Sequence, residues 1–146
     1  MDSSKLIYDW NVIDYEINRN PANHPHGVWF DDETLRDGLQ SPSARNPTIN
    51  EKTELLSYME RLGIQKVDLG LPGAGPFHRE HINAMLSHII ENDYQIRPGA
   101  AVRTLMQDIE PLVEMQQQHG IQIQASAFLG TSPIRCLLYT SPSPRD

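Results

Sequence analysis

Cysteine is nearly absent from this chain: among 146 residues there is one, Cys136. A lone thiol cannot form an internal disulfide framework, and outside the C-terminal stretch that holds Cys136 the chain offers no thiol for catalysis. Basic residues are also few, with 12 Lys and Arg against 19 Asp and Glu and a net charge of −7. Because no basic face is available to meet phosphates, we do not expect nucleic acid as a partner.

Long apolar runs are missing as well. No stretch approaches the roughly 20 apolar residues that a membrane-spanning helix needs. Residues 1–5 lack the basic-then-apolar layout of a secretory signal. The composition, 38% hydrophobic and 21% charged, is that of a globular protein. We therefore expect a cytoplasmic protein without a membrane partner.

What the chain does contain is a regular alternation of strand-like and helix-like stretches. Strand-like stretches fall at 28–31, 64–71, 96–102 and 121–128, the third interrupted by Pro98 and Gly99. Apolar residues at helical spacing lie between them, at 48–62, 82–89 and 104–119. This order predicts parallel strands joined by right-handed crossovers. A doubly wound sheet and a TIM barrel both satisfy it, although no G-x-G-x-x-G follows the first strand to favour a dinucleotide-binding sheet.

Several residues mark the expected helix ends. Thr48 and Glu51 have the spacing of a capping box, and Gly63 is placed to end the helix that they begin. Thr104 can cap the third helix, which ends near Gly120. The apolar stripes expected to face the sheet are Leu55, Leu56, Met59 and Leu62 on the first helix and Leu105, Ile109, Leu112 and Val113 on the third.

Two pairs of histidines have spacings compatible with a shared metal ion. His24 and His26 flank a proline in a loop, and His78 and His81 stand three residues apart on or near a helix. Histidines at such positions are more often solvated surface residues, so we assign neither pair to a metal.

Chemistry is expected at the end of the first strand, where an apolar run gives way to acids, an arginine and a glycine. In a (β/α)8 barrel the carboxyl ends of the strands carry the active site. Asp37 can ligate a hard divalent cation, and the adjacent Arg36 can hold an oxyanion that the cation also polarises. Gly38 allows the backbone to approach a ligand closely. A solvated turn with a surface ion pair has the same composition, so the residue types alone leave both interpretations open.

Residues 32–40 read DETLRDGLQ, which resembles the D-x-T-L-R-D-G-x-Q signature of the metallolyase-type TIM barrels. That family includes 2-isopropylmalate synthases, homocitrate synthases, citramalate synthases and hydroxymethylglutaryl-CoA lyases. Residues 61–72, 103–109 and 128–134 resemble three further family segments, LG-(strand)-E-x-G-F-P, R-A-(x)3-D-I and F-I-A-T-S-P-I. The resemblance selects the barrel and implies an α/β fold forming the first half of a (β/α)8 TIM barrel, about four β/α units.

The resemblance also implies roles for particular residues. Asp37 would bind a divalent metal (Mg, Mn or Zn), Arg36 would be the catalytic group that stabilises the developing enolate oxygen, and Gln40 would support the site by hydrogen bonding. Asp68 stands where relatives usually carry a glutamate facing the 2-oxo acid, and its side chain is one methylene shorter. The further substrate-binding residues implied are Arg103, Ser126 and Thr131, with Ser126 at a position that is histidine in isopropylmalate synthases.

The implied reaction condenses an acyl-CoA with a 2-oxo acid, and the acyl-CoA co-substrate is acetyl-CoA. The resemblance also implies that the full-length protein is a homodimer. The family's remaining metal ligands, an H-x-H on a late strand, do not follow the first strand in this sequence. They, the general base and most of the acyl-CoA site are expected beyond Arg135. We therefore expect the polypeptide as written to be inactive by itself.

The expected organisation has three parts. Residues 1–26 form an N-terminal leader, and residues 27–135 form the partial TIM-barrel catalytic domain. Residues 136–146 resemble the translation of a transposon-type sequencing adapter; a disordered Ser/Pro-rich tail is the alternative. Removing Arg145 and Asp146 takes one charge from each sign and leaves the net charge unchanged.

Three other functions fit parts of the sequence. A carbon–carbon lyase or aldolase of the same superfamily, of the hydroxymethylglutaryl-CoA lyase type, would carry the same signature. A degenerate barrel acting as a binding module is suggested by the departures at Asp68 and Ser126. A small self-standing α/β protein requires residues 136–146 to be genuine.

Overall fold

The computed structural model describes residues 29–42 and 44–130, and within them Trp29–Phe128 form one compact unit. Its strands are β1 (Asp31–Asp32), β2 (Lys66–Asp68), β3 (Arg97–Arg103) and β4 (Gln124–Phe128). Its helices are α2 (Ile49–Leu62), α3 (Pro76–Glu91) and α4 (Met106–His119), with short 3-10 turns at η4 (Gly38–Gln40) and η5 (Pro72–Ala74). The expected leader 1–26 with His24 and His26, the position Thr131, and the segment 136–146 lie outside the described residues.

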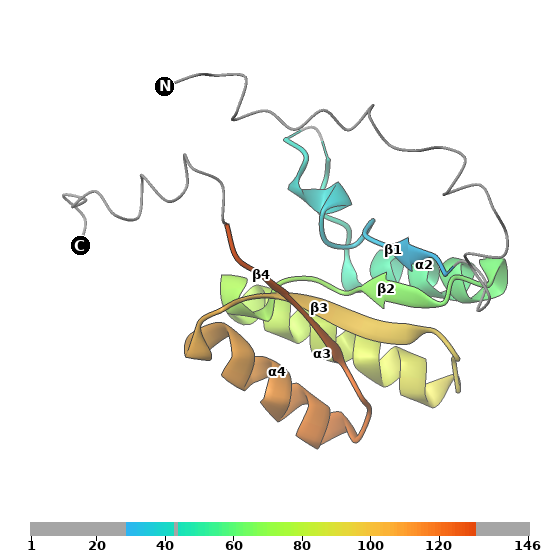
Figure 1. The fold of residues 1–146 in the computed structure, drawn as a ribbon. Helices are drawn as coiled ribbons and strands as arrows, with labels where there is room; N and C mark the ends of the chain where they lie inside the picture. Colours follow the sequence, from blue (N-terminus) through green and yellow to red (C-terminus); the bar gives the residue numbers. More distant parts are fainter. Residues whose placement is uncertain (1–28, 43, 131–146) are drawn as a thin grey trace, which may run out of the picture. The chain divides into compact units, whose positions relative to one another are not determined.

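The strands form a parallel sheet in the order β1-β2-β3-β4, so each strand pairs with the next one along the chain. Figure 1 shows α2, α3 and α4 lying together along one side of this sheet. Sequential parallel strands with helices on one side are the arrangement of a (β/α)8 barrel, whereas a doubly wound sheet carries helices on both faces. The predicted α/β fold, a partial TIM barrel, is confirmed.

Alternation along the strands separates an apolar face from a polar one. Val67 and Leu69 of the β2 region and Ala100 and Val102 of β3 belong to the core, packed with the buried sides of the helices. Asp68, between the first pair, therefore points to the opposite face. There the register pairs Ala101 with Ser126, so that their side chains lie beside each other on the polar face. This face is where the site is found.

The predicted first strand is wrong in its extent and burial. β1 begins at Asp31, and the apolar residues before it are exposed, Trp29 by 55% and Phe30 by 63%. The physical reason is that, among the described residues, β1 is the first strand of the sheet and pairs only with β2. The Arg97 guanidinium lies 4.4 Å from the centroid of the Trp29 ring, a cation–π contact that partly covers it.

The first helix forms as its local sequence predicts. The Thr48 side chain accepts from the Glu51 N–H, the Glu51 side chain accepts from the Thr48 N–H, and Gly63 closes the helix at φ 74°. Leu56 and Met59 are buried, but Leu62, expected in the stripe, is exposed. β3 also differs from expectation, because it runs without a break through Pro98 and Gly99.

The expected start of the third helix is wrong. α4 begins at Met106 after Leu105, and no side chain caps it; Gly120 ends it as predicted, at φ 65°. Its buried side carries Asp108, Pro111, Leu112 and Met115, while Leu105 and Val113 are exposed. The buried side of α4 is therefore rotated relative to the expected apolar stripe, because the Asp108 side chain turns inward and accepts a hydrogen bond from Arg103. In the described part of the chain, every helix is too short or too polar to cross a membrane.

Candidate active site

The segment after β1 is folded into a compact turn that holds Arg36 at the carboxyl edge of the sheet. The Asp32 carboxylate accepts from the Thr34 N–H at 2.8 Å, and the Glu33 carbonyl accepts from the Gly38 N–H at 3.1 Å. Leu35 is buried in the core and anchors the turn from below. The turn is therefore ordered by its own hydrogen bonds and by one apolar anchor, which argues against a loose solvated loop.

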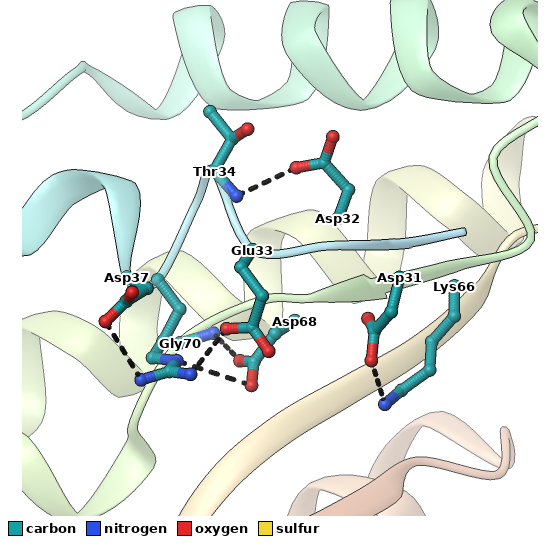
Figure 2. Close-up of polar contacts among 9 residues, drawn as sticks. Asp31, Asp32, Glu33, Thr34, Asp37, Lys66, Asp68 and Gly70 are labelled. Atoms are coloured by element: carbon teal, nitrogen blue, oxygen red, sulfur yellow. Dashed lines mark hydrogen bonds and ion pairs between the residues drawn. The ribbon is translucent and has the colours of Figure 1, made fainter. Parts of the chain in front are cut away.

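Three carboxylates surround the Arg36 guanidinium. Its Nη2 lies 2.5 Å from Glu33 Oε2, its Nη1 lies 3.4 Å from Asp37 Oδ1, and its Nε lies 3.5 Å from Asp68 Oδ2. Figure 2 shows Glu33, Asp37 and Asp68 converging from the turn and from the end of β2. Burial alone would lower the pKa of Arg36, but the hydrogen bond and charge of Glu33, with the charges of Asp68 and Asp37, raise it. The guanidinium is a fixed cation held in one orientation.

Asp68 is the fully buried member of this group. Its Oδ1 accepts from the Gly70 N–H at 2.9 Å, a contact drawn in Figure 2, and its Oδ2 has no hydrogen bond within the described structure. Burial is the largest effect on its pKa and raises it; the Glu33 charge adds to this, while the Gly70 hydrogen bond and Arg36 oppose it. A carboxylate kept charged only at a cost is typical of functional positions.

A cavity of about 450 Å³, here the Ser126 cavity, opens on the polar face of the sheet. Three residues implied by the sequence resemblance line it together: Arg36, Gln40 and Ser126. They come from the turn after β1, from η4 and from β4, nearly 90 residues apart in the chain. Leu71, Ala101, Ala127 and Phe128 complete its wall with largely apolar surface. Small polar groups on a mostly apolar wall are the usual form of a small-molecule site.

Arg103 is placed differently from the other implied substrate-binding residues. It does not line the Ser126 cavity. Its guanidinium meets the buried Asp108 carboxylate through two bonds, Nε to Oδ2 at 2.6 Å and Nη2 to Oδ1 at 2.7 Å. The Arg103 N–H also donates to Asp108 Oδ2 at 3.1 Å. These bonds from Arg103 are the main reason that the pKa of Asp108 is lowered despite burial.

No structural role was predicted for Asp108 from the sequence. Its carboxylate lies against Gly73 of η5. A Cβ at Gly73 would stand 2.2 Å from Asp108 Oδ1, so only glycine lets η5 lie against this carboxylate. The signal was present as an arginine followed five residues later by an aspartate in the first turn of a helix. The contacts of Asp108 with Arg103 and Gly73 therefore join the start of α4 to the end of β3 and to η5.

The Asp37 carboxylate, expected from the resemblance to bind a metal ion, is exposed at the edge of the turn. Its side chain is 66% exposed and only weakly held by Arg36, so its oxygens are open to a ligand. Within residues 29–42 and 44–130, no three His, Cys, Asp or Glu side chains are grouped as a metal site. An exposed carboxylate of this kind could serve as one oxygen ligand of a divalent cation such as Mg²⁺, Mn²⁺ or Zn²⁺, and the described residues do not supply a complete set of ligands.

Comparison with known proteins agrees with this geometry. Residues 28–137 match the HMGL-like family model. The chain is 31% identical over 103 residues to a 2-isopropylmalate synthase of Brevibacillus brevis, covering 70% of this chain and 19% of that protein. It is 34% identical over 103 residues to the 2-isopropylmalate synthase of Campylobacter fetus, with the same coverage of 70% and 19%. The match to that of Campylobacter hominis is 31% over 115 residues, covering 79% and 22%.

The chain spans about a fifth of the length of these curated relatives. The matched region includes the turn after β1, the sheet and the Ser126 cavity. The family model covers most of the chain. The parallel sheet with helices on one side, and the arginine held by carboxylates at its carboxyl edge, agree with that match. This chain belongs to the HMGL-like family.

Proposed function

We propose that the chain is the N-terminal part of a metal-dependent acyltransferase that condenses acetyl-CoA, or another acyl-CoA, with a 2-oxo acid. The observation that carries the proposal is the Ser126 cavity, which Arg36, Gln40 and Ser126 line together. The exposed Asp37 carboxylate does not line this cavity but contacts its Arg36 at 3.4 Å. The likeness to 2-isopropylmalate synthases supports the reaction class.

Arg36 is suited to the charge that develops in this reaction. When the enolate carbon of the acyl-CoA attacks the 2-oxo carbon, a carbon–carbon bond forms and the carbonyl electron pair moves to oxygen. A guanidinium already oriented by Glu33, Asp37 and Asp68 stabilises that oxygen without reorganising. A divalent metal, when bound, would polarise the same carbonyl as a Lewis acid.

Gln40 and Ser126 would orient the substrate. Their amide and hydroxyl groups offer hydrogen bonds to a carboxylate or carbonyl, and the apolar remainder of the wall accommodates an alkyl group. We include Asp68, as the buried residue behind Arg36, and Arg103 and Thr131 in the proposed substrate-binding region. The general base and the remaining metal ligands belong, in this proposal, to the chain beyond Arg135.

The same proposal places the full-length protein in the cytoplasm as a homodimer. Its partners would be the acyl-CoA and the 2-oxo acid, with neither nucleic acid nor membrane involved. The net charge of −7 argues against binding to nucleic acid.

The test is to sequence the source DNA across the codons for Arg135 and Cys136 and to express the extended reading frame. Release of CoA thiol from acetyl-CoA is then measured with a panel of 2-oxo acids, after chelation and after adding Mg²⁺, Mn²⁺ or Zn²⁺. We expect metal-dependent release with at least one acid, lost in Asp37→Asn and retained in the surface control Glu114→Gln. Folded, metal-loaded protein that releases no thiol with any acid would contradict the proposal.

A binding module is the second candidate, and two residues favour it. Asp68 and Ser126 both stand where the resembled synthases carry other residues, a glutamate and a histidine. A serine does not titrate near neutrality as histidine does. Saturable binding of a 2-oxo acid without thiol release, in protein that contains the H-x-H ligands, would favour this candidate.

A further inference from the structure

A second cavity also borders Arg36, and three of its basic lining residues, Lys52, His78 and His81, have no role in the proposed reaction. This cavity, here the Lys52 cavity, has a volume of about 150 Å³. Its polar lining residues are Arg36, Gln40, Asn46, Lys52, His78 and His81, and the remaining lining residues are leucines, a glycine and an alanine. No acidic residue lines it within the described structure. All its charged groups therefore favour a negative ligand.

Lys52 is buried here without a counter-ion. The residue is only 5% exposed, on the inner side of α2. Among residues 29–42 and 44–130, no carboxylate forms an ion pair with its ammonium group, which lies 5.9 Å from the centroid of the Phe77 ring. The neighbouring Glu51 is occupied with Arg45 and with the helix cap. The Lys52 ammonium group has no carboxylate partner within the described residues, so an anion in the cavity would supply its counter-ion.

His81 brings a second unsatisfied group to the same cavity. It is 7% exposed, and its Nδ1 is buried with no hydrogen-bond partner within the described structure. The ring is fixed by packing on Phe77, with centroids 4.1 Å apart. The charge of Glu80 acts on His81, but Glu80 does not line the cavity. A ring that is already held in place can contact a ligand in the cavity without first being ordered.

The size of the cavity suits a small polyatomic ion. One water molecule requires about 10–15 Å³ of such space, so 150 Å³ is about tenfold more than a single water needs. The donors around it are an ammonium group, imidazole rings and the amides of Gln40 and Asn46, which match oxygens carrying negative charge. The apolar part of the wall strengthens such contacts by excluding water.

We propose that the Lys52 cavity is a binding site for a small oxyanion, a phosphate or a carboxylate, held between Lys52 on α2 and His81 on α3. The site is separate from the Ser126 cavity but shares Arg36, Gln40 and Leu71 with it. An oxyanion there would lie next to the guanidinium that Glu33 and Asp68 orient, and would bias its position. The inference does not depend on the proposed acyl transfer.

The test is a titration of the 146-residue chain with inorganic phosphate at constant ionic strength, with chloride replacing phosphate in the reference. Calorimetry measures the dissociation constant. We expect saturable binding that weakens at least tenfold in Lys52→Met and His81→Gln. Arg61→Met removes a positive charge from the exposed side of the same helix, and we expect it to change the constant less than twofold. A parallel titration with acetate identifies the chemical class of the natural ligand. Tighter binding of phosphate than of acetate indicates a phosphoryl group, and tighter binding of acetate indicates a carboxylate.

A second measurement needs no substitution. In the wild-type chain labelled with 15N-histidine, phosphate should shift the imidazole signals of the two lining histidines, His81 and His78, saturably and with the calorimetric constant. Absence of saturable binding to either anion would overturn the proposal. So would equal binding by wild type and both cavity variants, or equal weakening by Arg61→Met. Because no acyl-CoA or 2-oxo acid is present, these outcomes are independent of the enzyme assay.

Discussion

Arg36 Nε and Asp68 Oδ2 face each other at 3.5 Å, and neither atom has a hydrogen bond within the described structure. The distance is too long for a hydrogen bond between them, so the pair retains charge attraction but leaves two buried polar atoms incompletely satisfied. A glutamate at this position, as the resembled synthases carry, would reach one methylene further. The shorter aspartate makes the interaction between the site's arginine and its buried acid weaker than it could be.

This relationship predicts an unusual pH dependence for Asp68. Its folded-state pKa is raised above the ordinary 3.8, chiefly by burial, so the folded protein binds this proton more tightly than the unfolded chain does. Its contribution to stability is therefore fully present below the ordinary value and is lost as the pH rises through the raised value. The unfolding free energy of wild type minus that of Asp68→Asn should decrease as the pH rises from below 3.8 through the raised pKa of Asp68.

Urea titrations at a series of pH values measure this difference. Asp93→Asn, an exposed acid at the end of α3, is the control and should show no comparable trend. A difference that grows with pH would mean that attraction to Arg36 outweighs the burial of Asp68.

Glu51 should behave in the opposite way. Its pKa is lowered from 4.5 to about 2, first by the hydrogen bond from Arg45 and then by those from Thr48. A depressed pKa means that the stabilisation is present above the unfolded value of 4.5 and is lost as the pH falls toward 2. Glu51→Gln should therefore be less stable than wild type at neutral pH, and the gap should close over that acidic range. Thermal unfolding monitored by circular dichroism measures it, with Glu110→Gln on α4 as a surface control.

Gly73 should resist substitution because of Asp108. An alanine Cβ would overlap the Asp108 carboxylate, which is fully buried and held by Arg103. Gly73→Ala is expected to lower the unfolding free energy by about 1–3 kcal/mol, the usual cost of overpacking. At Gly38 an added Cβ meets nothing closer than 3.8 Å, so Gly38→Ala should change stability by less than about 0.5 kcal/mol. Equal effects in the two variants would show that the contact with Asp108 does not limit residue 73.

The features that the sequence predicted best are those decided within a few residues. The capping box of Thr48 and Glu51, the glycine end at Gly63 and the order of strands and helices all depend on local conformation or hydrophobic spacing, and all are confirmed. Arg36, Gln40 and Ser126 were named together only from the family resemblance, and the structure brings them to one cavity.

The failures arise where a distant contact decides the outcome. Thr104 has a capping side chain, but α4 begins after Leu105 because Asp108 turns inward to bind Arg103. Trp29 and Phe30 are apolar enough for a core, yet they are exposed beside β1, which pairs with β2 alone in the part of the chain that the structure describes. Hydrophobic spacing along the sequence does not show which side chain an acid will bind, or whether a strand lies at the edge of its sheet.

Arg36 should act in the transition state and not merely bind substrate. In the extended enzyme, Arg36→Lys keeps a positive charge but loses the planar fork that Glu33, Asp37 and Asp68 hold in place. We expect kcat to fall by about 10²–10³-fold, the usual loss when an oxyanion donor is removed, with a smaller change in KM. Steady-state release of CoA thiol measures both constants, and Arg61→Lys on the exposed side of α2 should leave them within about twofold. A rise in KM at unchanged kcat would instead mean that Arg36 binds the substrate and the transition state equally, and that the charge developing on oxygen is stabilised elsewhere.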